Sequence, residues 1–113
     1  MDLIEGGGLL RILIGENDRY DGKPLYEWIV LHAKEEKLAG ATVFRGMMGF
    51  GATSRIHSSK ILRLSEDLPI LIEIVDTRTK LQAFLESIKD VMQGGLATLE
   101  KADVEYYRSK ERK

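Results

Sequence analysis

A glycine-rich stretch in the middle of the chain, followed closely by an arginine and a histidine, carries residue types that bind anions. Gly46, Gly49 and Gly51 follow a strand-like run, and Arg55 and His57 come shortly after them. Glycine loses more conformational entropy on folding than any other residue. A group of glycines is therefore usually present because the backbone needs a positive φ or must come close to another group. Because glycine N–H groups form anion-binding concavities and arginine adds a charge-assisted bond, the pattern indicates a phosphate or nucleotide contact.

A plainer interpretation of the same stretch is a tight turn beside a solvated arginine, because short glycine patterns are weak signals. His57 has three interpretations: it contacts a phosphate, it senses pH, or it is simply a solvated loop histidine. No acid accompanies Ser54 and His57, so a hydrolytic triad has little support and we expect no catalytic residues. The candidate ligand contacts here are Gly49, Phe50, Gly51, Arg55 and His57.

A second cluster of charged residues lies nearer the N-terminus, between a strand-like run and a helix start, where an anion is favoured. Its members are Glu16, Asp18, Arg19, Tyr20 and Lys23. The carboxylates of Glu16 and Asp18, two residues apart, can also hold Mg²⁺ through water. The opposite charges within the cluster equally fit surface ion pairs that pin a loop. Spacing alone does not identify a metal site, and we assign no metal.

Composition limits the classes of function. The chain has 113 residues, a hydrophobic fraction of 43%, a charged fraction of 31% and a formal net charge of −1. These values are typical of one globular domain and give no electrostatic case for binding nucleic acid or an anionic membrane. Cysteine is absent, which excludes disulfides, thiolate metal sites and cysteine nucleophiles. No apolar run approaches the ~20 residues of a membrane span, and the N-terminus lacks a signal-peptide pattern. We therefore expect a cytoplasmic protein that is not inserted in a membrane.

The hydrophobic pattern predicts which elements position these residues. We expect a flexible arm over 1–8, a single domain over 9–107 and a charged tail over 108–113. The predicted strands are Leu9–Ile14, Ala41–Arg45, Ile70–Val75 and Leu96–Tyr107. One helix follows Pro24, with Trp28 and His32 on its packed face. A second helix carries an apolar stripe from Leu81 to Met92, with a capping box at Thr79 and Gln82 and an end at Gly94–Gly95.

The predicted order is βαββαβ, with a long loop from Gly46 to Leu68 between the second and third strands. This order favours an α+β, ferredoxin-like sandwich, in which both helices cover one face of an antiparallel sheet. Apolar residues also alternate on the opposite face, at Leu9, Leu13, Leu71 and Val75. Such a face is one that two or more copies of the chain could bury together.

Several short motifs give the chain a family resemblance that covers nearly all of it after Gly8. They are Ile14–Tyr20, Gly22–Tyr26, Leu38–Val43, Arg45–Gly46, Gly49–Gly51, Ser54–His57 and Leu64–Pro69. On these motifs the chain is identified as a member of the bacterial and archaeal family known as domain of unknown function 190. That family is related to the nitrogen-regulatory PII proteins.

The PII resemblance implies a homotrimer that binds a nucleotide in the clefts between subunits. Gly49–Phe50–Gly51 resembles the PII turn at the root of a long loop, and Gly94–Gly95 lies where PII proteins have a second glycine-rich turn. Leu96 stands where PII proteins have a phosphate-gripping lysine, and Arg108 alone matches their C-terminal basic pair. The implied ligands are ATP, ADP and AMP.

The function that this resemblance implies is a non-enzymatic, PII-like regulatory protein that acts on a partner protein through its long loop. Family members are often encoded near small fluoride channels, which makes a membrane transport protein one candidate partner. Two other hypotheses stay open at this point. One is a metal-dependent hydrolase that uses Glu16, Asp18 and His57, and the other is a trimeric adaptor without a ligand.

Overall fold

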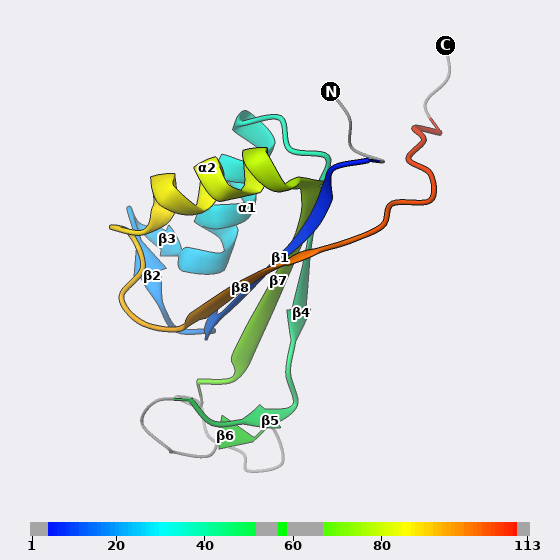
Figure 1. The fold of residues 1–113 in the computed structure, drawn as a ribbon. Helices are drawn as coiled ribbons and strands as arrows, with labels where there is room; N and C mark the ends of the chain where they lie inside the picture. The colour runs from blue at the N-terminus through cyan, green and yellow to red at the C-terminus, as the bar shows by residue number, and fades with distance from the viewer. Residues whose placement is uncertain (1–4, 52–56, 59–66, 111–113) are drawn as a thin grey trace.

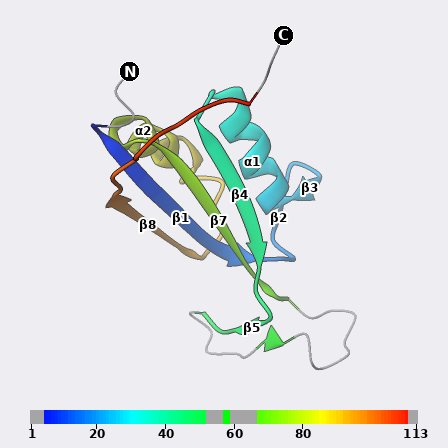
Figure 2. The same ribbon diagram turned by 90° about the vertical axis from the view of Figure 1, so that its right-hand side faces the viewer.

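The structure, a computed structural model, describes residues 5–51, 57–58 and 67–110, which form a sheet covered by helices on one face (Figure 1). Four strands form an antiparallel sheet in the order β4-β7-β1-β8. The main strands are β1 (Gly7–Gly15), β4 (Gly40–Arg45), β7 (Pro69–Thr77) and β8 (Leu96–Lys101). The helices are α1 (Leu25–Glu35) and α2 (Arg78–Ile88), and Figure 2 shows the sheet from β8 to β4. Neither helix is long and apolar enough to cross a membrane.

Strict alternation in the two central strands places one set of aliphatic side chains under the helices. Along β7, every second residue is buried, and these residues pair in register with the buried positions of β1. The helices contribute one apolar stripe each, which closes the core. The buried core consists mainly of Leu10, Ile12, Ile14, Leu25, Ile29, Ile70, Ile72, Ile74, Leu81, Phe84 and Ile88. The predicted α+β, ferredoxin-like βαββαβ plan is therefore confirmed, with the long loop between β4 and β7.

Strand boundaries differ from those predicted, most of all at the start of β1 and the end of β8, because the pairing partners decide where the strands end. β1 begins at Gly7 rather than Leu9, so Gly7 and Gly8 belong to the sheet and not to the predicted arm. A Cβ at Gly8 would lie 2.7 Å from the Arg78 Cγ, which explains the glycine there. β8 ends at Lys101 rather than Tyr107, since its neighbour β1 begins at Gly7 and the last bond runs from the Ala102 N–H to the Gly7 carbonyl.

The start of α2 also differs from the prediction. The helix is capped by Thr77, whose hydroxyl accepts a hydrogen bond from the Lys80 N–H at 3.2 Å, so the predicted cap at Thr79 is wrong. Asp76, immediately before the cap, is completely buried. Its carboxylate accepts the N–H groups of Thr77 at 2.6 Å and Ala39 at 2.8 Å, and Lys80 Nζ lies 3.6 Å away. Asp76 thus fixes the chain before β4 to the start of α2.

Two small hairpins are additional to the prediction. β2 (Arg19–Tyr20) pairs with β3 (Lys23–Pro24) through a turn at Asp21–Gly22, both of which have a left-handed backbone, with φ of 53° and 78°. The Asp-Gly pair is the sequence signal that indicates such a hairpin. Within the long loop, β5 (Met48–Gly49) pairs with β6 (His57–Ser58). A short hairpin therefore extends from the root of this loop.

The packed aromatic residues lie between the two helices. Phe84 is buried as predicted, whereas Trp28, also predicted to be core, is only partly buried. The Trp28 ring stacks on His32, with the ring centroids 4.9 Å apart, and His32 lies 5.4 Å from Phe84. His32 is therefore a packed histidine, as its place on the apolar stripe of the helix indicates.

The uncovered face of the sheet carries apolar residues on both sides of a charged row. The apolar row crosses all four strands and consists of Phe44, Leu71, Leu13 and Leu96. In the charged row, Arg11 donates to Glu73 at 3.1 Å and to Glu100 at 2.6 Å. The hydrogen bond to Glu73 raises the pKa of the Arg11 guanidinium above its already high usual value. The four residues predicted to lie on this face do so, because Leu13 pairs with Leu71 in the apolar row and Leu9 pairs with Val75 on the other side of Arg11.

Candidate ligand site

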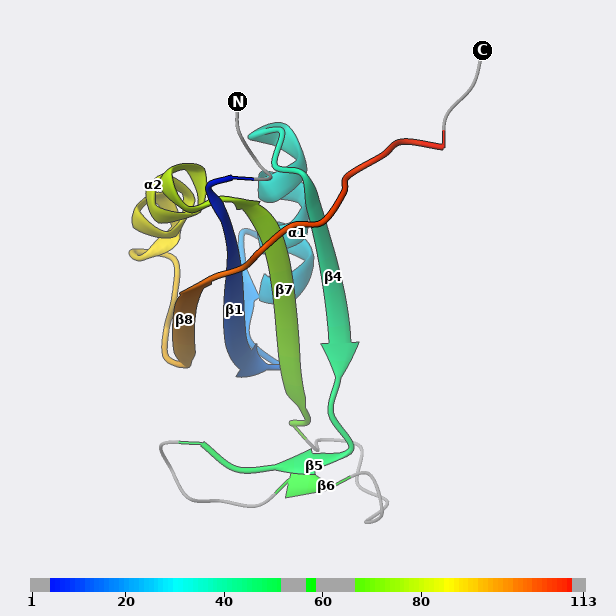
Figure 3. The ribbon, with the colours of Figure 1, turned by 45° about the vertical axis from the view of Figure 1, so that its right-hand side comes forward.

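The glycine-rich segment after β4 runs beneath the lower end of the sheet, toward the edge at which β8 begins (Figures 1 and 3). Its first part rests on Pro69. The Gly46 N–H donates to the Pro69 carbonyl at 2.7 Å, and a Cβ at Gly49 would lie 3.2 Å from the Pro69 Cγ. At Gly51, by contrast, a Cβ would meet no atom of the described residues within 4 Å, and the backbone is not left-handed. Packing against the described part of the chain therefore explains Gly46 and Gly49 but gives no steric reason for Gly51.

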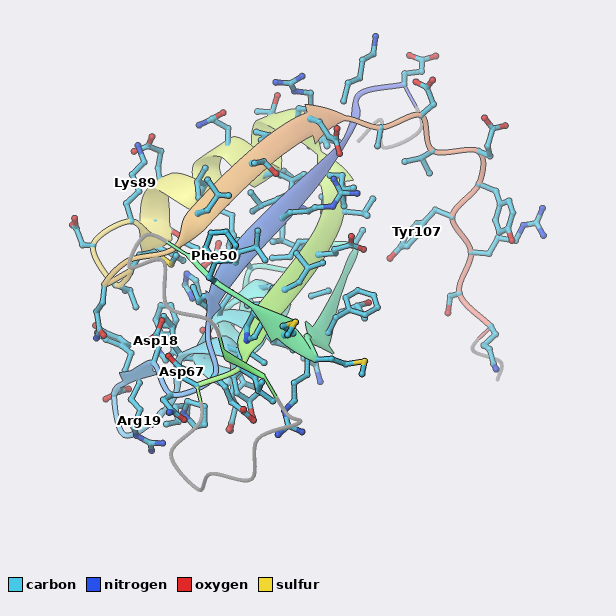
Figure 4. All side chains as sticks on the ribbon, turned by 90° about the horizontal axis from the view of Figure 1, so that it is seen from below. Asp18, Arg19, Phe50, Asp67, Lys89 and Tyr107 are labelled. Carbon is cyan, nitrogen blue, oxygen red and sulfur yellow. The ribbon has the colours of Figure 1, made fainter. Side chains whose placement is uncertain are left out.

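Large apolar side chains of this segment face away from the core. Phe50 is 69% exposed, and Met47 and Met48 are exposed as well. Figure 4 shows Phe50 projecting from the segment below the sheet. Of the predicted contacts that follow, Arg55 lies outside the described residues, and His57 is placed by its backbone in β6. The described part of this candidate site is thus an exposed backbone turn with an apolar rim.

The second predicted cluster is a turn that already holds carboxylates of the chain itself. The Gly15 N–H donates to the Asp18 carboxylate at 3.2 Å, and the Asn17 N–H donates to Asp67 at 2.8 Å. Figure 4 shows Asp18, Arg19 and Asp67 gathered at this end of the sheet. Asp67 belongs to the Leu64–Pro69 motif, but its contact with Asn17 was not predicted, since the two residues lie far apart along the chain. The amide groups that an external anion would use here are therefore bonded internally.

The other members of that cluster have separate partners. Glu16 lies 3.1 Å from Arg45 Nε, and Arg19 donates to the Gly22 carbonyl at 3.0 Å within the β2–β3 hairpin. The Tyr20 ring packs edge-on against Trp28, with the ring centroids 5.0 Å apart. Lys23 lies in β3. Among the described residues, no group of three histidine, cysteine, aspartate or glutamate side chains is arranged to hold a metal ion.

The predicted turn at Gly94–Gly95 joins α2 to β8, and its two glycines have different structural roles. Gly95 has a φ of 99°, and a Cβ there would overlap the Leu13 carbonyl oxygen. Gly94 has no left-handed backbone, and a Cβ would meet nothing within 4 Å. Just before the pair, the Gln93 side chain donates to the Arg19 carbonyl at 3.0 Å. The fold therefore requires Gly95, whereas Gly94 is an open backbone position like Gly51.

The C-terminal segment that carries Arg108 leads away from both glycine turns. Residues 102–110 have no regular secondary structure, and they cross the uncovered sheet face near its upper end (Figure 3). Tyr107 donates to the Ala39 carbonyl at 2.9 Å, and the Arg108 guanidinium lies 4.5 Å from the centre of the Tyr106 ring. Within one chain, this segment and the turns at 49–51 and 94–95 lie at opposite ends of the sheet (Figure 1).

Solved structures that share this fold include PII-like proteins. CPII, a nitrogen regulatory PII-like protein from Thiomonas intermedia K12 bound to ADP, AMP and bicarbonate, aligns with a TM-score of 0.66 at 14% identity over 87% of each chain. The same protein bound to ADP and bicarbonate gives 0.66 at 15% identity, over 90% of this chain and 94% of that one. The divalent ion tolerance protein CutA1 from Ehrlichia chaffeensis gives 0.57 at 15% identity, over 93% and 87%. At these identities, the likeness shows a shared PII-like fold.

Sequence comparison identifies the family. A UPF0166 protein of Aquifex aeolicus is 44% identical over 98 residues, which is 87% of this chain and 92% of that protein. A UPF0166 protein of Methanocaldococcus jannaschii is 33% identical over 85 residues, 75% and 78% of the two chains. The family model described as "Uncharacterized ACR", domain of unknown function 190, matches residues 7–104. The chain is thus a member of the domain of unknown function 190 (UPF0166) family, with a PII-like fold.

Proposed function

We propose that this chain is a cytoplasmic, non-enzymatic regulatory protein that assembles as a homotrimer and binds an adenine nucleotide between its subunits. The nucleotide phosphates would contact the open backbone at Gly51 and Gly94, and Arg55 and His57 would add contacts from the long loop. Arg108 would come from a neighbouring subunit. The observation that carries this proposal is that Gly51 and Gly94 are both exposed, and that a Cβ at either would meet no atom of the described residues within 4 Å.

The separation of these parts within one chain supports a site between chains. The Arg108 segment leaves the upper end of the sheet, and both glycine turns lie at its lower end (Figure 1). One copy therefore does not bring Arg108 to the glycines, whereas an adjacent copy can. The ADP and AMP bound to CPII, a protein with the same fold, favour an adenine nucleotide as the ligand.

A thermal-shift screen tests this function with the protein alone. ATP, ADP, AMP, 2-oxoglutarate and inorganic phosphate are each added to the purified chain, because a ligand that binds only the folded state raises the melting temperature. We expect at least one adenine nucleotide to raise it more than phosphate does. No rise with any adenine nucleotide at millimolar concentration would contradict the nucleotide assignment and favour the adaptor hypothesis.

The apolar row on the uncovered sheet face is the surface on which we expect the copies to associate. Replacing Leu13, which is 37% exposed, with glutamate places a charge in the middle of this row. We expect L13E to run as a single chain of 12.8 kDa, because a charge buried without a partner is strongly unfavourable. Light scattering after gel filtration measures the mass.

The matched control for L13E is Leu31→Glu. Leu31 is an equally exposed leucine, at 45%, but it lies on α1 and not on the uncovered sheet face. L31E should keep the mass of the parent protein. If L13E also keeps that mass, the apolar row is not the association surface.

A methyl group at Gly51 should weaken nucleotide binding and leave the fold unchanged. The Cβ of G51A would meet no atom of the described residues within 4 Å, so we expect a melting temperature close to that of the parent. If the phosphates approach this backbone closely, the methyl group should weaken binding by about tenfold or more, equivalent to ~1.4 kcal/mol. Isothermal titration measures the nucleotide affinity of G51A and of the control variant Gly40→Ala. Gly40 is equally open but lies at the start of β4.

The hydrolase hypothesis has less support from the described contacts. Glu16 is paired with Arg45, and Asp18 accepts a backbone N–H, so neither carboxylate points alone toward a shared centre. A partner protein, including a membrane transport protein, remains part of the proposal. The exposed Met47, Met48 and Phe50 form a suitable contact surface, because methionine adapts to different partners.

A further inference from the structure

We propose that residues 15–20 bridge the two glycine turns of the proposed site and hold them at a fixed spacing. Asp67 and Gln93 are then positioning residues for that site. The ligand part of this inference rests on the proposed function, whereas the bridge itself rests on contacts in the free chain. The two turns belong to segments that start from opposite edges of the sheet, because residues 46–51 follow β4 and Gly94–Gly95 precedes β8.

The first part of the bridge fastens residues 46–49 to the start of β7. The Pro69 carbonyl accepts the Gly46 N–H at 2.7 Å. The Pro69 ring lies so near Gly49 that a Cβ there would be 3.2 Å from its Cγ. Any displacement of Pro69 would therefore move the backbone just before Phe50 and Gly51.

The second part fastens the residues before β7 to the turn after β1. The Leu68 carbonyl accepts the Glu16 N–H at 2.8 Å, and the Asp67 carboxylate accepts the Asn17 N–H at 2.8 Å. The same carboxylate fills the space beside Gly15, where a Cβ would lie 2.6 Å from Asp67 Oδ2. Leu68 is buried, which adds an apolar anchor. The glycine at position 15 is thus explained by the carboxylate that lies against it.

The third part connects this turn to Gly94. The Gln93 side-chain amide donates to the Arg19 carbonyl at 3.0 Å, and the Arg19 guanidinium donates to the Gly22 carbonyl at 3.0 Å, which closes the β2–β3 hairpin. Gln93 immediately precedes Gly94. Contacts between neighbouring residues therefore run without a gap from Gly49 to Gly94, so a ligand that shifts one turn also displaces the other.

Amide hydrogen exchange in the free protein tests the bridge. Gln93→Ala removes one exposed side chain, so the fold should be kept, and Gln82→Ala, on the exposed face of α2, is the matched control. We expect Q93A to speed exchange about threefold or more at the amides of Asn17 and Gly46, both of which are bonded within the bridge, because a neutral hydrogen bond of this kind is worth such a factor. Q82A should leave these amides unchanged.

A second variant changes Asp67, which belongs to the second part of the bridge. Asp67→Asn keeps the shape of the side chain but weakens the bond from the Asn17 N–H, and we expect it to shift the NMR resonances of the Gln93 side-chain amide. Changes in Q93A that stay within residues 19–23 and 92–96, or equal changes in Q82A, would overturn the bridge. Because these measurements need no ligand, they separate a failed bridge from a failed nucleotide assignment. If nucleotide binds, Q93A should also weaken it several-fold.

Discussion

Replacing Asp76 with alanine should lower the free energy of unfolding by about 3 kcal/mol, since each buried N–H that loses its acceptor costs about 1–3 kcal/mol. The carboxylate is completely buried and accepts the N–H groups of Ala39 and Thr77. In D76A both groups lose their acceptor, and Lys80 loses its ion-pair partner. For a chain of this size, we expect a fall of about 10 °C or more in melting temperature.

Two other variants give this prediction its controls. Asp76→Asn keeps one carbonyl acceptor in the same place and should lie between D76A and the parent. Glu86→Ala removes an exposed acid of α2 that, like Asp76, pairs with a lysine, in this case Lys89. E86A should change stability by no more than about 0.5 kcal/mol. Chemical denaturation that gives D76A and E86A the same stability would contradict the role assigned to Asp76.

The second large effect is expected at Gly95. An alanine there must adopt a φ of 99°, and its Cβ would overlap the Leu13 carbonyl oxygen. A residue other than glycine in such a conformation costs about 1–3 kcal/mol before any clash, so we expect G95A to lose about 3 kcal/mol of stability. Thermal unfolding measures this loss.

Gly94→Ala is the matched control for this position, one residue away in the same turn. Its Cβ would meet nothing within 4 Å and the backbone is not left-handed, so stability should change by no more than about 1 kcal/mol. Under the proposed function, however, G94A should weaken nucleotide binding. Equal losses of stability in G94A and G95A would contradict the different roles assigned to these two glycines.

Most of the fold could be predicted because the hydrophobic period changes clearly between strands and helices. The alternation in β7 and the stripe in α2 identify their buried faces from the sequence alone. The end of β8 could not be predicted in this way. Val104, Tyr106 and Tyr107 favour a strand, but the neighbouring strand β1 begins at Gly7, so there is no partner in this chain to continue the pairing.

The candidate site could be predicted only in part, because its geometry depends on contacts between residues that are distant in the sequence. The Gly94–Gly95 turn is marked by its composition, yet only the structure shows that Gly95 is required by the fold and Gly94 is not. The Leu64–Pro69 motif contains Asp67 but does not indicate its contact with Asn17, which joins residues 50 positions apart. The hairpin at Asp21–Gly22 was not predicted either, although an Asp-Gly pair is a recognised hairpin signal.

Calorimetric titration of ADP into the purified protein, with its mass measured by light scattering, tests whether a nucleotide binds between subunits. We expect saturable heat with one nucleotide per chain, on an assembly of three chains of 12.8 kDa each. We also expect G51A to weaken this binding and G40A to leave it unchanged. Absence of heat at millimolar ADP, or full binding by a single chain, would contradict a nucleotide site formed between subunits.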